Sequence, residues 1–477
     1  MRTKLVVLGV FAVLAGCSDQ VAPTAVTAPS TQTAPSGAAL DALAAEGAST
    51  PADHFIMGFT AATPPQDVYR IVAQAGGSYT PIAGTGFGVV RGISDADADS
   101  LRTVTGVTGV ARDVVLTWVP GTEAVRATAG DVTVATDQSG AAFFLPFQWY
   151  LRQINADDAW LTTNQGAGAR VAILDTGIDP GHLDLNGRVD LTSSASMLTP
   201  GSSPCGSVDE TTIFDLNFHG TFVSALVTSN GIGMGSVAPD AQLVAFKVLN
   251  CSGRGSFLDV INGIIAATNA GANVINMSLG AIVSRRSSGP LIDALQAAVD
   301  FATAHGVTVV AAAGNDAIDF DHLPKDLADA KIMDIPGMLK NVLSVGATAP
   351  VNQQNFDQLA TYTNFGKQGT DVMAPGGDLV AGGVQQDLII SACSRFVCGV
   401  SPTGGNFYVL ASGTSFSSPL TAGAAAVALS QGQEPAHCII KGADRITGRG
   451  NDPLYSRGRV DVVGAATCSV HDVVSDE

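Results

Sequence analysis

The sequence predicts an α/β fold in which a parallel central sheet is covered by helices on both faces. Short apolar runs typical of buried strands, among them Val171–Leu174 and Leu243–Phe246, recur within residues 146–468. Helical patterns near 256–270 and 290–305 alternate with these runs, and this alternation is typical of parallel sheets. The chain also contains 54 glycines and only 6% aromatic residues, which suits tight turns between strands and helices.

Three further apolar runs continue the series: Val274–Met277, Val307–Ala313 and Val342–Val345. In open parallel sheets, ligands bind beyond the carboxyl ends of the strands. We therefore expect the chemistry of the protein directly after these runs.

Length and charge limit the classes of protein to consider. The 477 residues exceed one ordinary domain, so we expect a main body together with smaller parts. Apolar residues make up 46% of the chain, which is enough for a sizeable core. The net charge of −18 argues against a nucleic-acid partner, because phosphate binding requires clustered Lys and Arg.

The first 17 residues resemble a lipoprotein-type export signal. Arg2 and Lys4 precede an apolar run, Leu5–Leu14, that is too short to span a bilayer. The sequence L-A-G-C ending at Cys17 resembles the bacterial box in which the cysteine becomes the lipidated first residue. The alternative is an ordinary signal peptide with a chance cysteine. We expect export from a bacterial cell, to the extracellular space or to a lipid anchor at the cell envelope, and no transmembrane helix.

A small α+β module is expected between two low-complexity stretches. Residues 18–50 are rich in Ala, Thr, Pro and Ser and are predicted to be a disordered linker. A second linker is predicted at 120–145. Between them, residues 54–119 have the β-α-β-β-α-β order of a ferredoxin-like module. The expected elements are strands at 54–59, 78–83, 86–93 and 107–117 and helices at 66–75 and 94–104.

Six cysteines remain after Cys17 is set aside, and in an exported chain they suggest three disulfides. The sequence alone allows several pairings. Proximity favours Cys205 with Cys251, Cys393 with Cys398, and Cys438 with Cys468. No spacing among them resembles a zinc cluster, so no metal site is expected.

Three short motifs carry candidate catalytic side chains. Asp175 follows an apolar run in D-T-G-I-D, and His219 opens a helical pattern in N-F-H-G-T-F-V. Ser415 lies in G-T-S-F-S-S-P before a helix of small residues, where the helix dipole favours developing negative charge. Each motif alone is weak evidence, because turns, structural histidines and helix caps produce the same patterns.

The D-T-G tripeptide also leaves an aspartic protease open. Such an enzyme needs two carboxylates that share a proton. The chain has no second D-T-G or D-S-G, so this reading requires a dimer. It predicts activity only at low pH and leaves His219 and Ser415 without roles.

Together the motifs resemble those of the subtilisin-like serine proteases, the subtilase family. The chain order Asp, His, Ser is the order of subtilisin. Two further segments match in the expected sequence: N-M-S-L-G at 276–280 resembles the strand that pairs with substrate, and A-A-A-G-N at 311–315 resembles the segment with the oxyanion-hole asparagine. The resemblance covers roughly residues 146–468. It implies a three-layer subtilisin-like fold with a parallel sheet, and serine endopeptidase activity.

The resemblance implies roles for individual residues. Ser415 would attack the scissile carbonyl, His219 would act as general base and then acid, and Asp175 would orient the imidazole. Asn315 and the backbone N–H of Ser415 would hold the oxyanion. The residues expected to bind substrate are Ser278, Leu279, Gly280, Ala313 and Gly314. They would line an open S1 pocket with broad specificity and some preference for large apolar residues. The chemistry requires no cofactor, the partners are protein or peptide substrates, and a monomer is expected.

The resemblance also implies a function for residues 54–119, as an inhibitory propeptide that helps the catalytic domain fold and blocks its cleft. Self-cleavage within roughly 119–146 would then mature the enzyme. A lipid on Cys17 would tether the released propeptide rather than the protease, unless the two stay bound. The alternative is an unrelated binding module that the mature protein retains.

The chain departs from the family pattern at three places. Asp184 aligns with a calcium-ligand position of some subtilases, but the loop 229–237 looks too short for the remaining ligands. Asp184 is therefore expected to be a solvated surface carboxylate, and structural calcium is not supported. Phe416 stands where methionine is more usual, with little expected consequence. Residues 379–408 have no clear counterpart and are expected to be a surface insertion.

An inactive binding protein with the same fold is the alternative from another class. The joint presence of Asp175, His219, Asn315 and Ser415 argues against it, because loss of function usually removes at least one such residue. Nothing in the sequence names the physiological substrate. Nutritional degradation and maturation of one specific partner both stay open.

Overall fold

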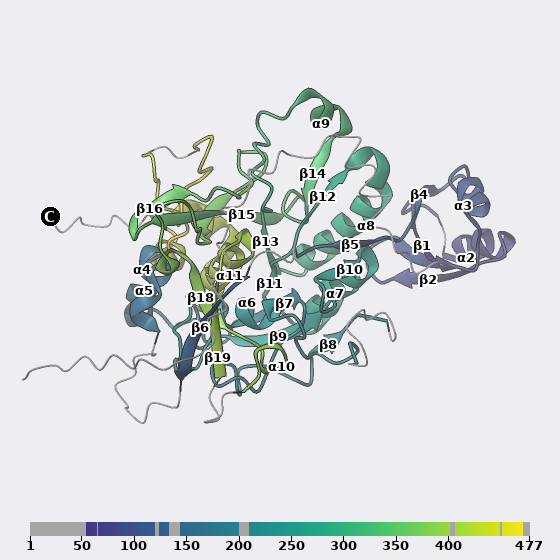
Figure 1. The fold of residues 1–477 in the computed structure, drawn as a ribbon. Coiled ribbons are helices and arrows are strands. Elements are labelled where there is room, and N and C mark those ends of the chain that lie inside the picture. Colours follow the sequence, from purple (N-terminus) through teal and green to yellow (C-terminus); the bar gives the residue numbers. More distant parts are fainter. Residues whose placement is uncertain are drawn as a thin grey trace, which may run out of the picture. The chain divides into compact units, whose positions relative to one another are not determined.

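The computed structural model describes residues 54–63, 65–119, 124–132, 144–199, 209–400, 406–448 and 451–470. The export signal with Cys17 and the linker at 18–50 lie outside the described residues. Figure 1 shows the α/β architecture that the alternating pattern predicts: helices lie against a central sheet, and a small α+β module precedes it in the chain.

The module has the predicted β-α-β-β-α-β order. Its elements are β1 (His54–Phe59), α2 (Pro65–Gln74), β2 (Ser78–Ile82), β3 (Phe87–Arg91), α3 (Asp95–Leu101) and β4 (Val107–Arg112). The four strands form one sheet in the order β2-β3-β1-β4. Phe55 and Met57 point from β1 into the module's own core, whereas Ile56 packs with the main body. This two-sided burial follows from the period of two along a strand.

The last predicted strand of the module is two strands. β4 ends at Arg112, and a separate strand, β5 (Val115–Thr117), pairs antiparallel with β10 (Arg254–Ser256) of the main body. Asp113 lies between them, fully buried, and its carboxylate accepts a hydrogen bond from the backbone N–H of Phe257 at 3.1 Å. The chain therefore leaves the module by joining the edge of another element.

The central sheet consists mainly of parallel strands, in the order β15-β13-β11-β7-β9. They are β7 (Arg170–Asp175), β9 (Gln242–Lys247), β11 (Val274–Met277), β13 (Thr308–Ala312) and β15 (Val342–Val351), each at a predicted apolar run. Three further strands extend the sheet: β8 (Ala195–Ser196), β16 (Gln354–Leu359) and β17 (Val372–Pro375).

Helices cover both faces of this sheet, as Figure 1 shows. Val171 and Ile173 of β7 pack in one core with α6 (His219–Val227) and α11 (Thr414–Ser430). Ala172 and Leu174 of the same strand pack in a second core with α7 (Phe257–Asn269) and α8 (Arg285–Ala304). Because both faces are buried, the strand is a continuous apolar run rather than an alternating one.

The predicted linker at 120–145 contains a strand, so that prediction was wrong for part of its length. The backbone of β6 (Ala124–Val132) pairs antiparallel with β19 (Asn406–Ala411). β19 also pairs with β18 (Ile389–Ala392), which gives a three-stranded sheet. The small residues of β6 resemble a linker in composition, and the partner that makes it a strand lies almost 300 positions further along the chain.

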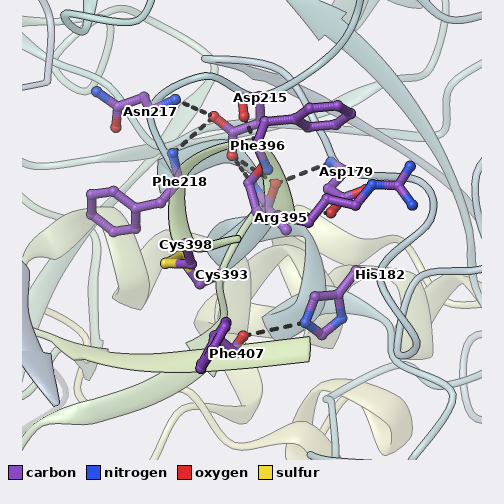
Figure 2. The surroundings of a disulfide bond; sticks show 12 residues. Asp179, His182, Asp215, Asn217, Phe218, Cys393, Arg395, Phe396, Cys398 and Phe407 are labelled. Carbon is purple, nitrogen blue, oxygen red and sulfur yellow. Dashed lines mark hydrogen bonds and ion pairs between the residues drawn. A yellow bond between two sulfur atoms is a disulfide. The ribbon is translucent and has the colours of Figure 1, made fainter. Parts of the chain in front are cut away.

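The prediction that residues 379–408 are a surface insertion was wrong for part of this range. Their strand β18 is buried at all four positions, and Ile389 and Ile390 belong to the core that contains α6 and α11. Figure 2 shows the Cys393–Cys398 disulfide that closes the turn after this strand. The Ser391 hydroxyl donates to the carbonyl of Phe222 in α6 at 2.7 Å. The segment is therefore part of the framework around the helix that begins at His219.

Two of the three disulfide pairings that proximity favoured are present, Cys393 with Cys398 and Cys438 with Cys468. Cys251 is disulfide-bonded, and Cys205 lies outside the described residues. None of the helices in the described ranges is long and apolar enough to cross a bilayer.

Short elements complete the described chain. They are η1 (Leu145–Phe147), α4 (Trp149–Gln153), α5 (Ala156–Thr162), β12 (Ala281–Ser284), α9 (Lys325–Ala330), β14 (Ile332–Ile335), η2 (Gln385–Asp387), α10 (Arg395–Cys398), α12 (Pro435–Gly442) and α13 (Val462–Thr467).

Candidate active site

The structure brings the predicted Asp175 and His219 into direct contact. Asp175 is the last residue of β7 and His219 the first residue of α6, and both are buried. His219 Nδ1 lies 2.8 Å from Oδ1 and 3.0 Å from Oδ2 of the carboxylate. Because Nδ1–H donates to this carboxylate, the neutral ring carries its basic lone pair on Nε2.

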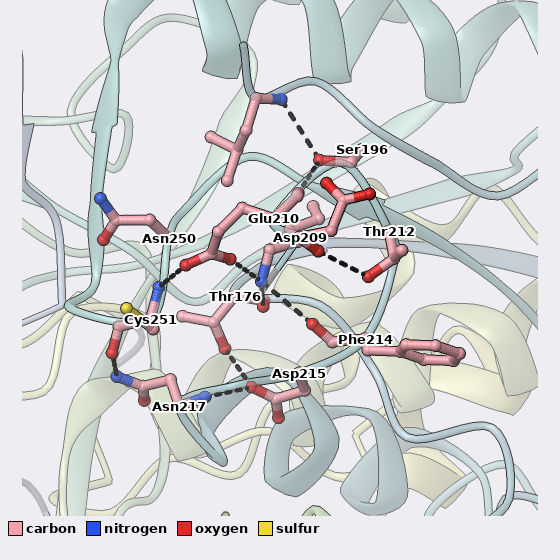
Figure 3. Close-up of polar contacts among 12 residues, drawn as sticks. Thr176, Ser196, Asp209, Glu210, Thr212, Phe214, Asp215, Asn217, Asn250 and Cys251 are labelled. Atoms are coloured by element: carbon pink, nitrogen blue, oxygen red, sulfur yellow. Dashed lines mark hydrogen bonds and ion pairs between the residues drawn. The ribbon is translucent and has the colours of Figure 1, made fainter. Parts of the chain in front are cut away.

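A buried carboxylate that the sequence analysis missed holds the start of α6. Asp215 accepts hydrogen bonds from the backbone N–H groups of Asn217, Phe218 and Thr221 at 2.8–3.0 Å, and from the Thr176 hydroxyl at 2.9 Å. Figure 3 shows its bonds to Thr176 and Asn217. Phe218 has φ of 97°, a costly backbone conformation for a side chain of this size. Asp215 stabilises that turn. It thereby fixes the position at which α6 begins and the position of His219, the first residue of the helix.

A buried ion pair supports the loop after Asp175 and was also missed. Lys247, at the end of β9, lies 2.7 Å from Glu210, and both side chains are almost inaccessible. The Lys247 ammonium also donates to the backbone carbonyls of Thr176 at 2.6 Å and Phe214 at 3.0 Å. Its charge is thus matched by a carboxylate and two carbonyl dipoles, which a buried ammonium requires. A lysine ending an apolar strand run was the available sequence signal.

Ser415 lies at the start of α11, 4% exposed, next to the histidine's helix. The ring of Phe416 is 5.6 Å from the His219 ring and 4.3 Å from that of Phe222, centroid to centroid. The motif on α11 and the motif on α6 therefore meet through their aromatic neighbours. The first-turn position of Ser415 places its hydroxyl at the positive end of the helix dipole.

Asn315 is held against the residue that precedes Ser415. Its Oδ1 accepts hydrogen bonds from the backbone N–H of Thr414 at 2.9 Å and from the Thr414 hydroxyl at 2.8 Å. The backbone N–H of Gly314 donates to the same hydroxyl at 3.2 Å. With its oxygen fixed in this way, the Asn315 side chain presents its NH₂ group as the donor.

The segment predicted to bind substrate backbone holds the end of the amino-terminal module. The N–H of Gly280 donates to the carbonyl of Trp118 at 3.0 Å. The Trp118 indole is buried, donates to the carbonyl of Gly255 at 2.8 Å, and lies edge-on to Phe257 at 5.4 Å. Residues 115–119 thus lie between β10 and the segment that ends at Gly280, and the first three of them form β5.

The other predicted substrate-binding residues lie directly before Gly280 or directly before Asn315. Ser278 and Leu279 are buried, and Ser278 Oγ lies 2.9 Å from Asn276 Nδ2. The Asn276 side chain in turn accepts a hydrogen bond from Ser418 of α11 at 2.7 Å. This bond links the substrate-binding segment to the helix of Ser415. Ala313 is buried between β13 and Asn315.

Asp184 is not the solvated surface carboxylate that was predicted. It is fully buried, and it accepts hydrogen bonds from Ser229, Ile232, Gly233 and Tyr408. These donors occupy the lone pairs that a cation would need, so the residues present do not fit a calcium ion here. In the described part of the chain no group of three or more His, Cys, Asp or Glu side chains could hold a metal.

The disulfide turn of Figure 2 contacts the same loops that carry the candidate site. The Ser394 hydroxyl donates to the backbone carbonyl of Asp215 at 2.7 Å. Arg395 forms an ion pair with Asp179 at 3.1 Å, and its backbone N–H donates to that carboxylate at 2.9 Å. Asp179 belongs to the motif that begins at Asp175, and Asp215 lies just before His219. The turn therefore contacts both the loop after Asp175 and the loop before His219.

Comparison with known proteins agrees with this fold and site. Residues 166–439 match the family model described as Subtilase family. Thermitase from Thermoactinomyces vulgaris is 32% identical over 329 residues, which cover 68% of this chain and 97% of thermitase. The thermophilic serine proteinase of Bacillus sp. strain AK1 is 31% identical and covers 68% of each chain. Among solved structures, the epidermin leader peptide processing serine protease of Staphylococcus aureus superposes with a TM-score of 0.68 at 22% identity, covering 89% of this chain and 98% of its own.

These findings define a serine endopeptidase with a subtilisin-like α/β fold. The chain belongs to the subtilase family.

Proposed function

We propose that this protease hydrolyses peptide bonds with Ser415 as nucleophile, His219 as general base and acid, and Asp175 as the group that orients the imidazole. The observation that carries the assignment is the buried His219–Asp175 hydrogen bond at the end of β7, beside the helix of Ser415. Ser415 attacks the carbonyl carbon while His219 Nε2 takes its proton. The same proton passes to the leaving amine, and water then hydrolyses the acyl-enzyme by the reverse sequence.

Asn315 is proposed to donate a hydrogen bond from its NH₂ group to the oxyanion of the tetrahedral intermediate. Thr414 fixes the opposite end of that amide, so the donor is oriented before reaction and costs little reorganisation. The backbone N–H of Ser415 is the second proposed donor.

Asn315→Ala is expected to lower kcat by roughly 10²–10³-fold with little change in KM, because the lost donor acts mainly on the transition state. Steady-state hydrolysis of a peptide substrate measures both constants. Asn341→Ala, at an exposed turn before β15, is the control and is expected to leave both constants unchanged. A rise in KM with unchanged kcat would assign Asn315 to substrate binding instead.

The amino-terminal module is proposed to be an inhibitory propeptide and folding aid. Its last described segment, 115–119, lies between the two segments that would bind an extended substrate, with the Gly280 N–H on the carbonyl of Trp118. A peptide bound in this way excludes substrate from the same backbone donors. Val119 is 4% exposed, so the end of this segment is packed against the main body.

The same contacts narrow the site of proposed self-cleavage. The backbone N–H of Val119 donates to the carbonyl of Gly253 at 3.2 Å. Ala124 pairs with Ala411, only four positions before Ser415. The bond to be cut is therefore expected between Val119 and Ala124, a shorter interval than 119–146.

Expression of residues 18–477 followed by intact-mass measurement tests this proposal. We expect the wild type to lose a fragment that ends between Val119 and Glu123, and Ser415→Ala to stay full length. A wild type that stays full length would contradict self-processing. Identical cleavage of both proteins would show that another protease makes the cut.

Export is proposed from residues 1–17, with Cys17 as the lipidated residue. A cut between Val119 and Ala124 would leave that lipid on the propeptide. The protease would then remain at the cell envelope only for as long as the two parts stay bound.

A further inference from the structure

A buried carboxylate lies beside the proposed substrate-binding residues and has no part in the reaction described so far. Asp334 belongs to β14 and is 1% exposed. Its Oδ1 lies 2.9 Å from the position that a Cβ atom would take at Gly280, and a Cβ atom at Gly314 would overlap its Oδ2. Asp334 therefore fits between these two residues only because both are glycine, and Gly314 also has φ of 94°.

The two oxygens of Asp334 are unequally satisfied. Oδ2 accepts a hydrogen bond from Asn364 Nδ2 at 3.2 Å, whereas Oδ1 is buried without a hydrogen-bond donor from the described residues. Asn364 cannot turn to help, because its own Oδ1 is fixed by the backbone N–H groups of Asp316 and Ile318. A buried carboxylate oxygen without a donor lowers the stability of the folded state. A hydrogen-bond donor from outside the chain would remove this penalty.

A second carboxylate shares the same weak donor. Asp316 Oδ2 lies 3.3 Å from the same Asn364 Nδ2. No Lys, Arg or His of the described chain forms an ion pair with Asp316 or Asp334, and the charge that acts on Asp334 is that of Asp316. Burial first, and then the Asp316 charge, raise the pKa of Asp334 well above its usual value. A cation between the two carboxyl groups would offset both effects and favour their charged forms.

The position of this acidic pair relative to the proposed reaction is set by its two glycine neighbours. Gly280 holds the carbonyl of Trp118, and Gly314 is hydrogen-bonded to Thr414, the residue before the proposed nucleophile. Asp334 thus lies between the segment that holds the incoming chain and the segment next to Ser415. Because one segment would hold substrate backbone and the other adjoins the proposed nucleophile, a substrate side chain that enters between them would belong to the residue immediately before the scissile bond, P1.

We propose that Asp334, with Asp316 beside it, selects Lys or Arg as the P1 residue of protein substrates. The proposal rests on the proposed function, since it requires that Ser415 performs the cleavage. An Arg guanidinium can donate to Asp334 Oδ1 and to Asp316 through different N–H groups, whereas a Lys ammonium offers a single point charge. Arg is therefore the preferred residue of the two. The large apolar P1 residue expected from the family resemblance would leave Oδ1 without a donor.

Self-cleavage does not depend on this selectivity. Residues 120–123 are Pro, Gly, Thr and Glu, so the interval between Val119 and Ala124 offers no basic P1 residue. The propeptide segment is tethered beside the serine, and a high effective concentration replaces side-chain recognition in such a reaction. Processing and P1 selectivity can therefore be measured separately in one protein.

The test uses the full chain after self-processing and four fluorogenic peptides that differ only in P1, which is Arg, Lys, Gln or Leu. For the wild type we expect kcat/KM with Arg to exceed that with Leu by about 100-fold, the size of effect that one buried charge-assisted hydrogen bond produces. Asp334→Asn keeps the shape of the side chain and should reduce the Arg to Leu ratio by about the same factor. Asp316→Asn should reduce it less, by about 5–10-fold.

Asp329→Asn is the matched control, because it removes one negative charge from an exposed position of α9, five residues before Asp334. Its ratio should equal that of the wild type. Competitive inhibition by benzamidine, a small aromatic amidine, gives a second measurement on the unaltered protein. We expect inhibition of the wild type and its loss in Asp334→Asn.

Four results would overturn the proposal. One is a wild type that prefers Leu to Arg, and another is an Asp334→Asn variant that keeps the wild-type ratio. The third is an equal loss with all four peptides, which would show that Asp334 is only structural. The fourth is a wild type that cuts none of the peptides and does not react with a fluorophosphonate. That result would overturn the proposed function too, and the missing fluorophosphonate reaction would distinguish this failure from a failure of selectivity alone.

Discussion

Ser415→Ala is expected to lower kcat for peptide hydrolysis by about 10⁶-fold, the loss produced by removing the corresponding residue type in subtilisin. The reason is that Ser415 is the proposed source of the attacking oxygen. The other hydroxyls of the first turn of α11 donate elsewhere, that of Thr414 to Asn315 and that of Ser417 to the carbonyl of Ala374. The candidate oxyanion donors and the segment that holds extended backbone would remain. Substrate binding should therefore persist, and the residual rate should stay above that of the reaction in water.

The measurement is kcat on a chromogenic peptide, together with labelling by a fluorophosphonate. Ser430→Ala is the matched control, since Ser430 ends the same helix and its hydroxyl donates only to the carbonyl of Val427. The control should keep full activity and labelling. A Ser415→Ala protein that still cleaves peptides or reacts with the probe would contradict the assignment of the nucleophile. Loss of activity in the control would point to damage to the helix rather than to chemistry.

Asp175→Asn is expected to lower kcat by about 10⁴-fold while the fold is retained. The carboxylate accepts the Nδ1–H of His219 at 2.8 Å, which keeps the lone pair on Nε2. An amide in its place can offer an NH₂ group to Nδ1, and the ring would then carry its proton on Nε2. Such a ring cannot accept the proton of Ser415, although every heavy atom stays in its position.

Steady-state kinetics near neutral pH and thermal unfolding together separate this explanation from a structural one. A wrong tautomer lowers kcat strongly near neutral pH while KM and the thermal unfolding midpoint stay close to those of the wild type. Asp158→Asn, at an exposed position of α5, is the control and should change neither constant. If Asp175→Asn unfolds at a much lower temperature instead, the carboxylate acts mainly in holding β7 to α6. Retained activity would remove Asp175 from the site altogether.

The local sequence pattern was sufficient to predict the strands that are buried on both faces and the elements whose apolar residues recur with a regular period. Residues 171–174 of β7 are all apolar because both faces of the strand pack against helices, so this run could be recognised without a partner. Asp175 follows that run directly, and a polar residue at the carboxyl end of a parallel strand is where α/β proteins bind ligands. The module's strands and helices were predicted for the same reason, since each carries its own period.

Local pattern failed where a residue's environment comes from distant parts of the chain. β6 is a strand only because β19 offers an unpaired edge, and β18 is buried only because α6 packs over it. Asp184 was predicted to be exposed, yet its donors include Tyr408, more than 200 positions away. Composition cannot show such partners, because burial and hydrogen bonding are properties of the packed chain.

The sequence by itself determined the fold class, the chain order of the candidate Asp, His and Ser, and the β-α-β-β-α-β module, because each depends on near neighbours. The tertiary structure decided the supports and the proposed selectivity. Asp215 and the Lys247–Glu210 pair hold the loops of the Asp–His pair, and the partners of these charged groups become apparent only in the packed chain. Asp334 lies between two glycines from separate segments, so its unsatisfied oxygen exists only once β12, β13 and β14 are brought together.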